Sequence, residues 1–314
     1  MNVLKPYFKY SLLFLFFLCV KFGLFSQIDS TYITPYDNNL TVKVYTTSKF
    51  NTLLLRSMQG EKTIEPNTPL GLGLGVTWKK WGMSFSYGFG FMRNQKKGNT
   101  QSIDIQVNYC GRKVVWDIMG QWYRGFHEDN SRNGYRFYKD VSTMRFGVFG
   151  QYIFNSQKFS YSAAFHQKER QLRSAGSWLL GAGIYFNRID LGDLDFLETA
   201  SPASFKQSNF QLGPSGGYVH TWIMKKKLFI TLSLSLGLNI GVNMEERDFM
   251  IAPSVVPRFA MGYNGEKWGL HVSYVNHLIY TLVSKAEKIG SSTGNIQLVF
   301  TKRFDIPSKG NKRK

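Results

Sequence analysis

Residues 228–243 read LFITLSLSLGLNIGVN and alternate without a break between large aliphatic and small or polar side chains. Successive side chains of a β-strand point to opposite faces, so the pattern predicts one strand with an apolar face and a polar face. Strands in globular proteins usually stop after about five or six residues. This segment has sixteen, and at a tilt of about 40° it would rise roughly 40 Å. Such a strand can cross the apolar band of about 25 Å that an outer-membrane barrel presents to lipid.

The same alternation recurs along most of the chain. It is clearest at 70–78, 81–91, 102–110 and 143–154, and less regular at 53–57, 113–125, 158–168, 177–187, 209–223, 252–263, 267–282 and 295–304. Tight basic segments such as 225–227 and longer polar segments such as 126–141 and 169–176 separate these candidates, as expected for short periplasmic turns and long outer loops. We therefore predict an all-β fold, an antiparallel transmembrane β-barrel.

The number of candidate strands conflicts with the symmetry of such a barrel. The segments above make thirteen with 228–243, whereas a single-chain bacterial barrel has an even number of strands. Either a further strand lies within 188–208, or one candidate is not part of the wall. We expect about twelve strands, with ten and fourteen open.

The first residues resemble an export signal. Lys5 and Lys9 precede an apolar run at 11–20, and Ser26 is a small residue suited to cleavage. Loss of the signal removes three lysines and no acid, which lowers the formal net charge from +19 to +16. The predicted divisions are a cleaved signal peptide at 1–26, a periplasmic segment at 27–49, the barrel at 50–304 and a basic tail at 305–314.

The charge and the cysteines limit the classes of protein that the chain can represent. Cys110 is the only cysteine after residue 26, so an internal disulfide framework is excluded. Basic residues gather in tight turns such as 225–227, where they would contact anionic lipid headgroups. No nucleic-acid-binding motif accompanies them. We expect outer-membrane lipids as partners, and no nucleic acid.

The last strand and several motifs resemble known proteins. The segment NIQLVFTKRF (295–304) ends in Phe304 and resembles the closing strand that the barrel-assembly machinery recognises. The segments QKERQLRSAGSWLLGAGIYF (167–186), EPNTPLGLGLGVTWKKWGMSFS (65–86), GYVHTW (217–222) and TKRF (301–304) are similar to an uncharacterised family of outer-membrane β-barrels of Gram-negative bacteria, a domain of unknown function. The resemblance implies an outer-membrane barrel and supplies no catalytic residue.

If the small and polar face of each strand points inward, a mixed set of charged and polar side chains lines the lumen. The candidates are Asp104, Gln106, Asp117, Gln121, Arg145, Gln151, His166, Lys168, Arg258, His271, Ser273, His277 and Arg303. One interpretation is a small-solute channel with a basic constriction at Arg145, Arg258 and Arg303 that favours anions. The other is structural, with Asp–Arg pairs filling a narrow barrel.

Two further hypotheses stay open. His271 and Ser273 share a face of one strand, and with Glu287 they would form the nucleophile, base and orienter of a lipid-modifying enzyme. Glu287 is predicted at the opposite rim, so no catalytic residue is assigned. A soluble secreted β-barrel would show the same alternation with its faces exchanged. No metal-site or cofactor spacing occurs, and we expect neither.

Overall fold

The computed structural model describes residues 28–36, 40–57, 60–78, 80–130, 134–192, 194, 205–225, 227–245, 247–282 and 288–304. The predicted signal peptide, the basic tail and Glu287 lie outside these ranges. Within them, no helix has the length and the apolar composition needed to cross a membrane.

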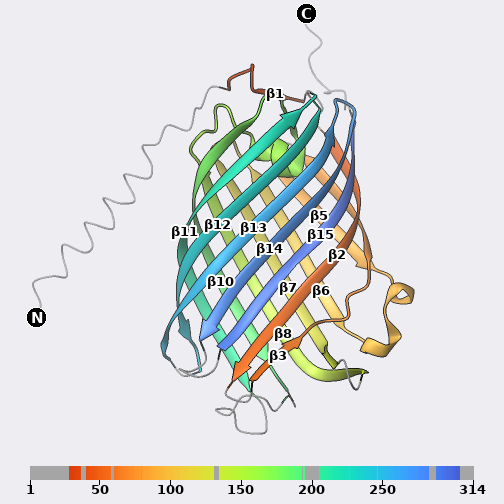
Figure 1. Ribbon diagram of the computed structural model, residues 1–314, viewed down its shortest axis with the longest axis vertical. Coiled ribbons are helices and arrows are strands. Elements are labelled where there is room, and N and C mark those ends of the chain that lie inside the picture. Colours follow the sequence, from red (N-terminus) through yellow and green to blue (C-terminus); the bar gives the residue numbers. More distant parts are fainter. Residues whose placement is uncertain are drawn as a thin grey trace, which may run out of the picture.

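Twelve antiparallel strands form a closed wall in the described part of the chain (Figure 1). They are β2 (Leu40–Ser57), β4 (Gly71–Trp78), β5 (Trp81–Gly88), β6 (Gln101–Cys110), β7 (Val114–Asn130), β8 (Gly134–Ile153), β10 (Ala175–Asp190), β11 (Lys206–Met224), β12 (Leu228–Asn243), β13 (Phe249–Asn264), β14 (Trp268–Leu282) and β15 (Lys288–Phe304). Each pairs with the wall strand that follows it, and β15 pairs with β2 to close the ring. The predicted all-β antiparallel barrel of about twelve strands is confirmed.

The two rims of the wall differ. Leu40 at the start of β2 pairs with Phe304 at the end of β15, so both lie at one rim, here called the terminal end. The opposite rim is called the loop end. Connections at the terminal end are short, as predicted, except residues 154–174 between β8 and β10. At the loop end β7 and β8 continue as a hairpin with only residues 131–133 between them, where a polar loop at 126–141 was predicted.

The orientation of the side chains shows which face of the wall is apolar. On β12, Leu236 is 55 % exposed on the outside, whereas its neighbour Ser235 is 3 % exposed and faces inward. The same arrangement places Leu74, Phe85 and Trp178 on the outer surface. In a soluble barrel these side chains would fill the interior. The wall is therefore apolar outside and polar inside, as a surface in contact with lipid requires.

One predicted boundary and one predicted wall strand are wrong. The wall begins at Leu40, so residues 40–49 belong to β2 and not to a periplasmic segment. The candidate strand at 158–168 is not in the wall. Together with the rest of 154–174 it forms a segment that contains the helical turn η3 (Ser162–His166) and the short strand β9 (Glu169–Gln171). Its removal reduces thirteen candidates to twelve and resolves the conflict in the strand count.

Residues 154–174 fold into the terminal end of the barrel and are called the plug. Figure 1 shows η3 inside the ring of strands, close to β1 (Ile33–Pro35). β1 pairs with β9 of the plug outside the main sheet. Phe159 and Tyr161 pack with the wall residues Val115 and Val219 in an apolar cluster. The plug is therefore an integral part of the core, and 169–176 is not the outer loop that the sequence predicted.

A second apolar cluster closes the loop end. Leu53, Leu55 and Ile289 pack there with Tyr123 and Phe126 of β7. The short strand β3 (Gly60–Ile64) pairs with the loop end of β2, and the next residue, Glu65, forms a two-way backbone bridge with His127 of β7. This bridge draws β2 and β7 together across the rim. The interior is thus bounded by the plug at one end and an apolar layer at the other.

Candidate functional site: a closed lumen and its plug

Apart from the three glutamines, ten of the thirteen candidate lumen residues remain, and not all of them lie on the wall. Six are buried wall residues: Asp117, Arg145, Arg258, His271, His277 and Arg303. Asp104 and Ser273 are partly buried on β6 and β14. His166 and Lys168, which were predicted on a wall strand, instead belong to the plug. The interior is therefore assembled from two sources, the wall and the inserted segment.

Arg258 and Asp117 join opposite parts of the wall. A guanidinium nitrogen (Nη2) of Arg258 on β13 donates to Asp117 Oδ2 on β7 over 2.7 Å. The two side chains are 10 % and 8 % exposed, so the pair is shielded from water. Burial of two charges is costly unless they satisfy each other. The pair therefore fixes the distance between β7 and β13, and it occupies the space that a pore would need.

Further hydrogen bonds cross the lumen on the loop side of this pair. Arg145 on β8 donates from Nε to Asn187 Oδ1 over 2.7 Å and from Nη2 to Ser291 Oγ on β15 over 2.8 Å. Thr293 on β15 donates to Gln121 Oε1 on β7 over 3.2 Å. The bond to Asn187 joins neighbouring strands, whereas the bonds from Arg145 to Ser291 and from Thr293 to Gln121 join strands that lie far apart in the ring. Arg145 and Arg258 are thus engaged side chains, and they do not line an open constriction.

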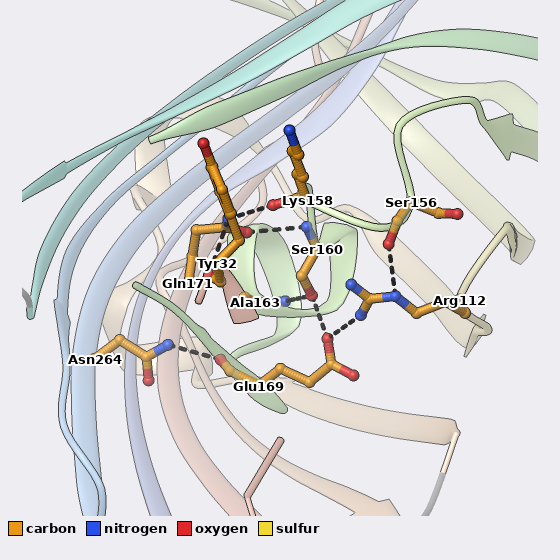
Figure 2. Close-up of polar contacts among 9 residues, drawn as sticks. All are labelled: Tyr32, Arg112, Ser156, Lys158, Ser160, Ala163, Glu169, Gln171 and Asn264. Carbon is orange, nitrogen blue, oxygen red and sulfur yellow. Dashed lines mark hydrogen bonds and ion pairs between the residues drawn. The ribbon is translucent and has the colours of Figure 1, made fainter. Parts of the chain in front are cut away.

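Glu169 anchors the plug to the wall (Figure 2). Its Oε2 accepts from Nη1 of Arg112, in the turn between β6 and β7, over 2.7 Å, and also from the Oγ of Ser160. Arg112 Nε donates to the carbonyl of Ser156 over 2.7 Å, and the amide of Asn264 on β13 donates to the carbonyl of Glu169 over 3.0 Å. The plug is held from two sides of the barrel.

Arg303 holds the plug at Gln167, two residues before Glu169. Its Nη2 donates to the carbonyl of Gln167 and to Asn264 Oδ1, both over 2.7 Å. Gln167 has a φ of 54°, which is uncommon for a residue with a side chain, and the bond from Arg303 stabilises it. The Arg303 guanidinium stacks on the ring of Tyr36 at 3.8 Å. Burial raises the pKa of Tyr36 to about 12, so its hydroxyl stays protonated and donates to Asn264.

Between the plug and the wall lies a chamber of about 110 Å³. Four basic side chains line it: Lys43, His166, Arg258 and His271. Asp117 is the sole carboxylate among the described lining residues, and it is paired with Arg258. Burial lowers the pKa of His166 in the plug, and the nearby Lys43 and Lys168 lower it further, so this imidazole is neutral at pH 7. The chamber carries an excess of positive charge.

Lys43 was not among the predicted lumen residues, because the predicted barrel began only at residue 50. A signal was present, since Leu40, Val42 and Val44 alternate with Thr41, Lys43 and Tyr45. Lys43 faces inward opposite Gly75 of β4. No ion pair joins it to any residue that the structure describes. Small inward residues on β4 and β5, among them Gly75 and Ser84, leave the room that the chamber occupies.

The proposed catalytic pair lies in the same chamber. His271 and Ser273 both line it from β14, but no hydrogen bond joins them among the contacts of the described chain. His271 Nδ1 is buried without a hydrogen-bond partner there. Glu287 falls outside the described residues, so the structure does not place the third member.

A wider pocket lies beside β5 and β6, in the loop-side half of the wall. These strands share only four register pairs, from Trp81↔Tyr109 to Ser84↔Gln106. Beyond them the strands separate around a pocket of about 570 Å³. The exposed apolar side chains of Phe85 and Ile103 are among its lining residues. Lys49 and Asp104 line it as well, with 3.3 Å between Nζ and Oδ2. This is the one site where Asp104 contacts a base among the described residues.

Comparisons with solved structures return outer-membrane barrels at low similarity. The outer membrane protease OmpT from Escherichia coli is 8 % identical with a TM-score of 0.38, and the match covers 88 % of this chain and 99 % of that chain. The translocator domain of the autotransporter NalP from Neisseria meningitidis is 13 % identical with a TM-score of 0.39, covering 88 % and 90 %. The toluene transporter TodX of Pseudomonas putida is 9 % identical with a TM-score of 0.31, covering 86 % and 91 %. At such distances none of their activities carries over.

The remaining comparisons concern sequence. No curated protein matches the chain. A family model described as Domain of unknown function (DUF4421) matches residues 27–304, which include the plug and the whole described wall. The match agrees with the resemblance to an uncharacterised family that the motifs indicated. The chain belongs to the DUF4421 family.

Proposed function

We propose that the protein is an integral barrel of the outer membrane, exported by a signal peptide that is cleaved near residue 26. The apolar outer surface of the wall supports this location, because side chains such as Leu236 would otherwise be exposed to water. The terminal end, with its short turns and the plug, would face the periplasm. Basic turns there would contact lipid headgroups, and the strand ending in Phe304 would be the segment that the assembly machinery binds.

We further propose that the barrel is structural and does not conduct solutes in this state. The observation that carries this proposal is the ion pair between Arg258 on β13 and Asp117 on β7, which meet inside the barrel with 2.7 Å between Nη2 and Oδ2. Release of the plug alone would not open a passage, because the apolar cluster around Leu53 and Phe126 closes the loop end independently. A small barrel filled with its own side chains is the expected alternative to a porin.

Cell fractionation and gel mobility test the location. The protein is expected in the outer-membrane fraction, with an N-terminus near Gln27 by mass spectrometry and with faster migration before heating than after. Recovery of the protein in the soluble periplasm, with no heat-dependent shift, would overturn the proposal. That result would favour the soluble secreted barrel, although such a barrel would leave its apolar surface in water.

A lipid-modifying enzyme is the weaker candidate. Its two described residues, His271 and Ser273, line the chamber beside the plug, on the inner side of the wall. A serine nucleophile also needs a hydrogen-bonded base, which the contacts of the described residues do not provide. Retention of every lipid species in cells carrying Ser273→Ala would agree with a structural role, and loss of a lipid modification in that variant would support the enzyme.

A further inference from the structure

We propose that the chamber between the plug and the wall binds one small tetrahedral oxyanion, of the phosphate class, through the ammonium group of Lys43. The site requires a free cation, a cavity of suitable size and hydrogen-bond donors directed into it. The structure provides each of these from different elements. The inference goes beyond the proposed structural barrel, and it depends on the lumen being closed.

The charge of the chamber is the first argument. Lys43 lines it without an ion-pair partner among the described residues, whereas Arg258 is neutralised by Asp117. Arg303 on β15, beside the plug, donates only to carbonyl and amide oxygens among the described residues. An ammonium group enclosed without a counter-charge is costly, and a bound anion would offset that cost.

Unsatisfied polar atoms are the second argument. His271 is 3 % exposed, lines the chamber and has a buried Nδ1 without a hydrogen-bond partner among the described groups. A neutral imidazole can present one N–H to an oxyanion. Gln297 lines the same space with an amide group, which can donate as well. Buried polar groups are normally satisfied, and in the tautomer that carries its proton on Nδ1 this orphan nitrogen would donate to an anion bound at Lys43.

The size of the chamber selects the class of ligand. A volume of about 110 Å³ accommodates a single small ion, and it is far below the roughly 300 Å³ at which pockets begin to hold drug-sized ligands. A phospholipid shares the phosphate chemistry, but its glycerol and acyl chains would have to pass through the wall or the plug. The free ion is therefore the ligand that we assign.

Calorimetric titration of inorganic phosphate into the full barrel tests the proposal. The protein is kept in phosphate-free detergent micelles without phospholipid. The expected result is one phosphate bound per barrel. Lys43→Gln should weaken the affinity by about tenfold or more, because a charge-assisted hydrogen bond is lost. The matched control is Lys227→Gln, in an exposed turn at the terminal end, which should leave the affinity unchanged.

A second variant covers the case in which Lys43→Gln fails to fold. Gly75 faces Lys43 across β4 and β2, and a Cβ placed there has only ordinary contacts, at 3.5 Å or more. Gly75→Leu should fill the chamber and abolish binding while Lys43 is retained, with folding verified by heat-dependent gel mobility. Absence of binding by the unmodified protein, or equal binding by Lys43→Gln, would overturn the proposal.

A second titration, in phospholipid nanodiscs, distinguishes the free phosphate ion from a lipid headgroup as the ligand. Binding of inorganic phosphate in micelles assigns the site to the free ion. Binding that appears only in nanodiscs would assign it to a lipid headgroup and overturn the proposal in its present form. A protein that fractionates with the outer membrane but binds no phosphate would refute this inference and leave the proposed location and structural role intact.

Discussion

Asp117 on β7 and Arg258 on β13 meet inside the barrel at 2.7 Å, although 141 positions separate them in the sequence. Each belongs to a strand whose outer face is apolar, and each points inward with a side chain about nine-tenths buried. The pair shows how this wall maintains its shape. Charges that could line a pore instead neutralise each other across it, and the remaining polar side chains bond around them.

Removal of one member of the pair should be more harmful than removal of both. Arg258→Ala leaves the Asp117 carboxylate buried without its partner, so we expect a loss of roughly 3–5 kcal/mol in the free energy of unfolding. The combined change Arg258→Met with Asp117→Leu should recover most of that loss, since apolar replacements of similar volume often match a buried pair. Urea unfolding followed by tryptophan fluorescence measures both. Equal losses in the single and combined variants would contradict the role assigned to the pair.

The stability cost of placing a charge on the outer surface should depend on its depth in the membrane. Leu236 lies near the middle of β12 and Leu228 at its terminal end, and both face outward. Leu236→Arg should destabilise the barrel in lipid vesicles by about 2–4 kcal/mol, whereas Leu228→Arg should cost about 0–1 kcal/mol because its charge reaches the interface. Reversible folding into vesicles gives both values. If the two substitutions cost the same, the placement of β12 across the membrane is wrong.

Two glycines on one strand form a matched pair. A Cβ at Gly73 would lie 2.2 Å from Cζ of Tyr45, whose ring fills the lumen, whereas a Cβ at Gly75 has ordinary contacts. Gly73→Ala must displace that ring and should cost roughly 1–3 kcal/mol. Gly75→Ala should change the stability by about 0.5 kcal/mol or less. Thermal unfolding of the two variants tests the comparison, and a greater loss for Gly75→Ala would show that Tyr45 is not packed as described.

The rate at which maleimide labels the Cys110 thiol should show how firmly the plug is held. It is free and buried on β6, and its backbone N–H donates to the Lys80 carbonyl, which also accepts from Lys168 of the plug. Glu169→Gln weakens the contacts with Arg112 and Ser160, so maleimide labelling of Cys110 should accelerate about tenfold, as expected for the loss of a charged hydrogen bond.

The control for this labelling is Glu266→Gln. Glu266 is 72 % exposed, and its pair with Arg170 joins the plug to the wall only at the surface. Exposed pairs contribute little to stability, so labelling should stay slow in this variant. The signal peptide must be absent, because it contains the other cysteine. An unchanged rate in Glu169→Gln would show that Glu169 does not anchor the plug.

Local alternation was sufficient to predict the wall but not the interior. The pattern on β12 specifies both the strand and its two faces, because a shift of one residue would exchange them. The segment 158–168 was misread because Phe159, Ser160, Tyr161 and Ser162 also alternate. Its position inside the barrel depends on contacts with Arg112, Asn264 and Val219 from distant strands. The number of wall strands could be determined only from the structure, which places this segment inside the barrel and not in the wall.

For the candidate site, too, local alternation predicts which residues face inward but not which of them contact each other. The inward residues could be named from the parity of each strand, but their partners could not, because register across the lumen depends on the diameter and tilt of the whole ring. Asp117 was expected inside, and its pairing with Arg258 was not predictable. Lys43 was missed although its strand alternates, because Thr46 and Ser48 interrupt the apolar face of β2.

Conductance across a planar lipid bilayer tests most directly whether the lumen is closed. Unmodified protein inserted from detergent is expected to give no steady current steps at voltages that leave the bilayer intact, because the pair of Arg258 and Asp117 and the two apolar clusters block the interior. Insertion is verified by protease protection of the same membranes. Stable, uniform open-channel steps from the unmodified protein would contradict a structural barrel and establish a channel in its place.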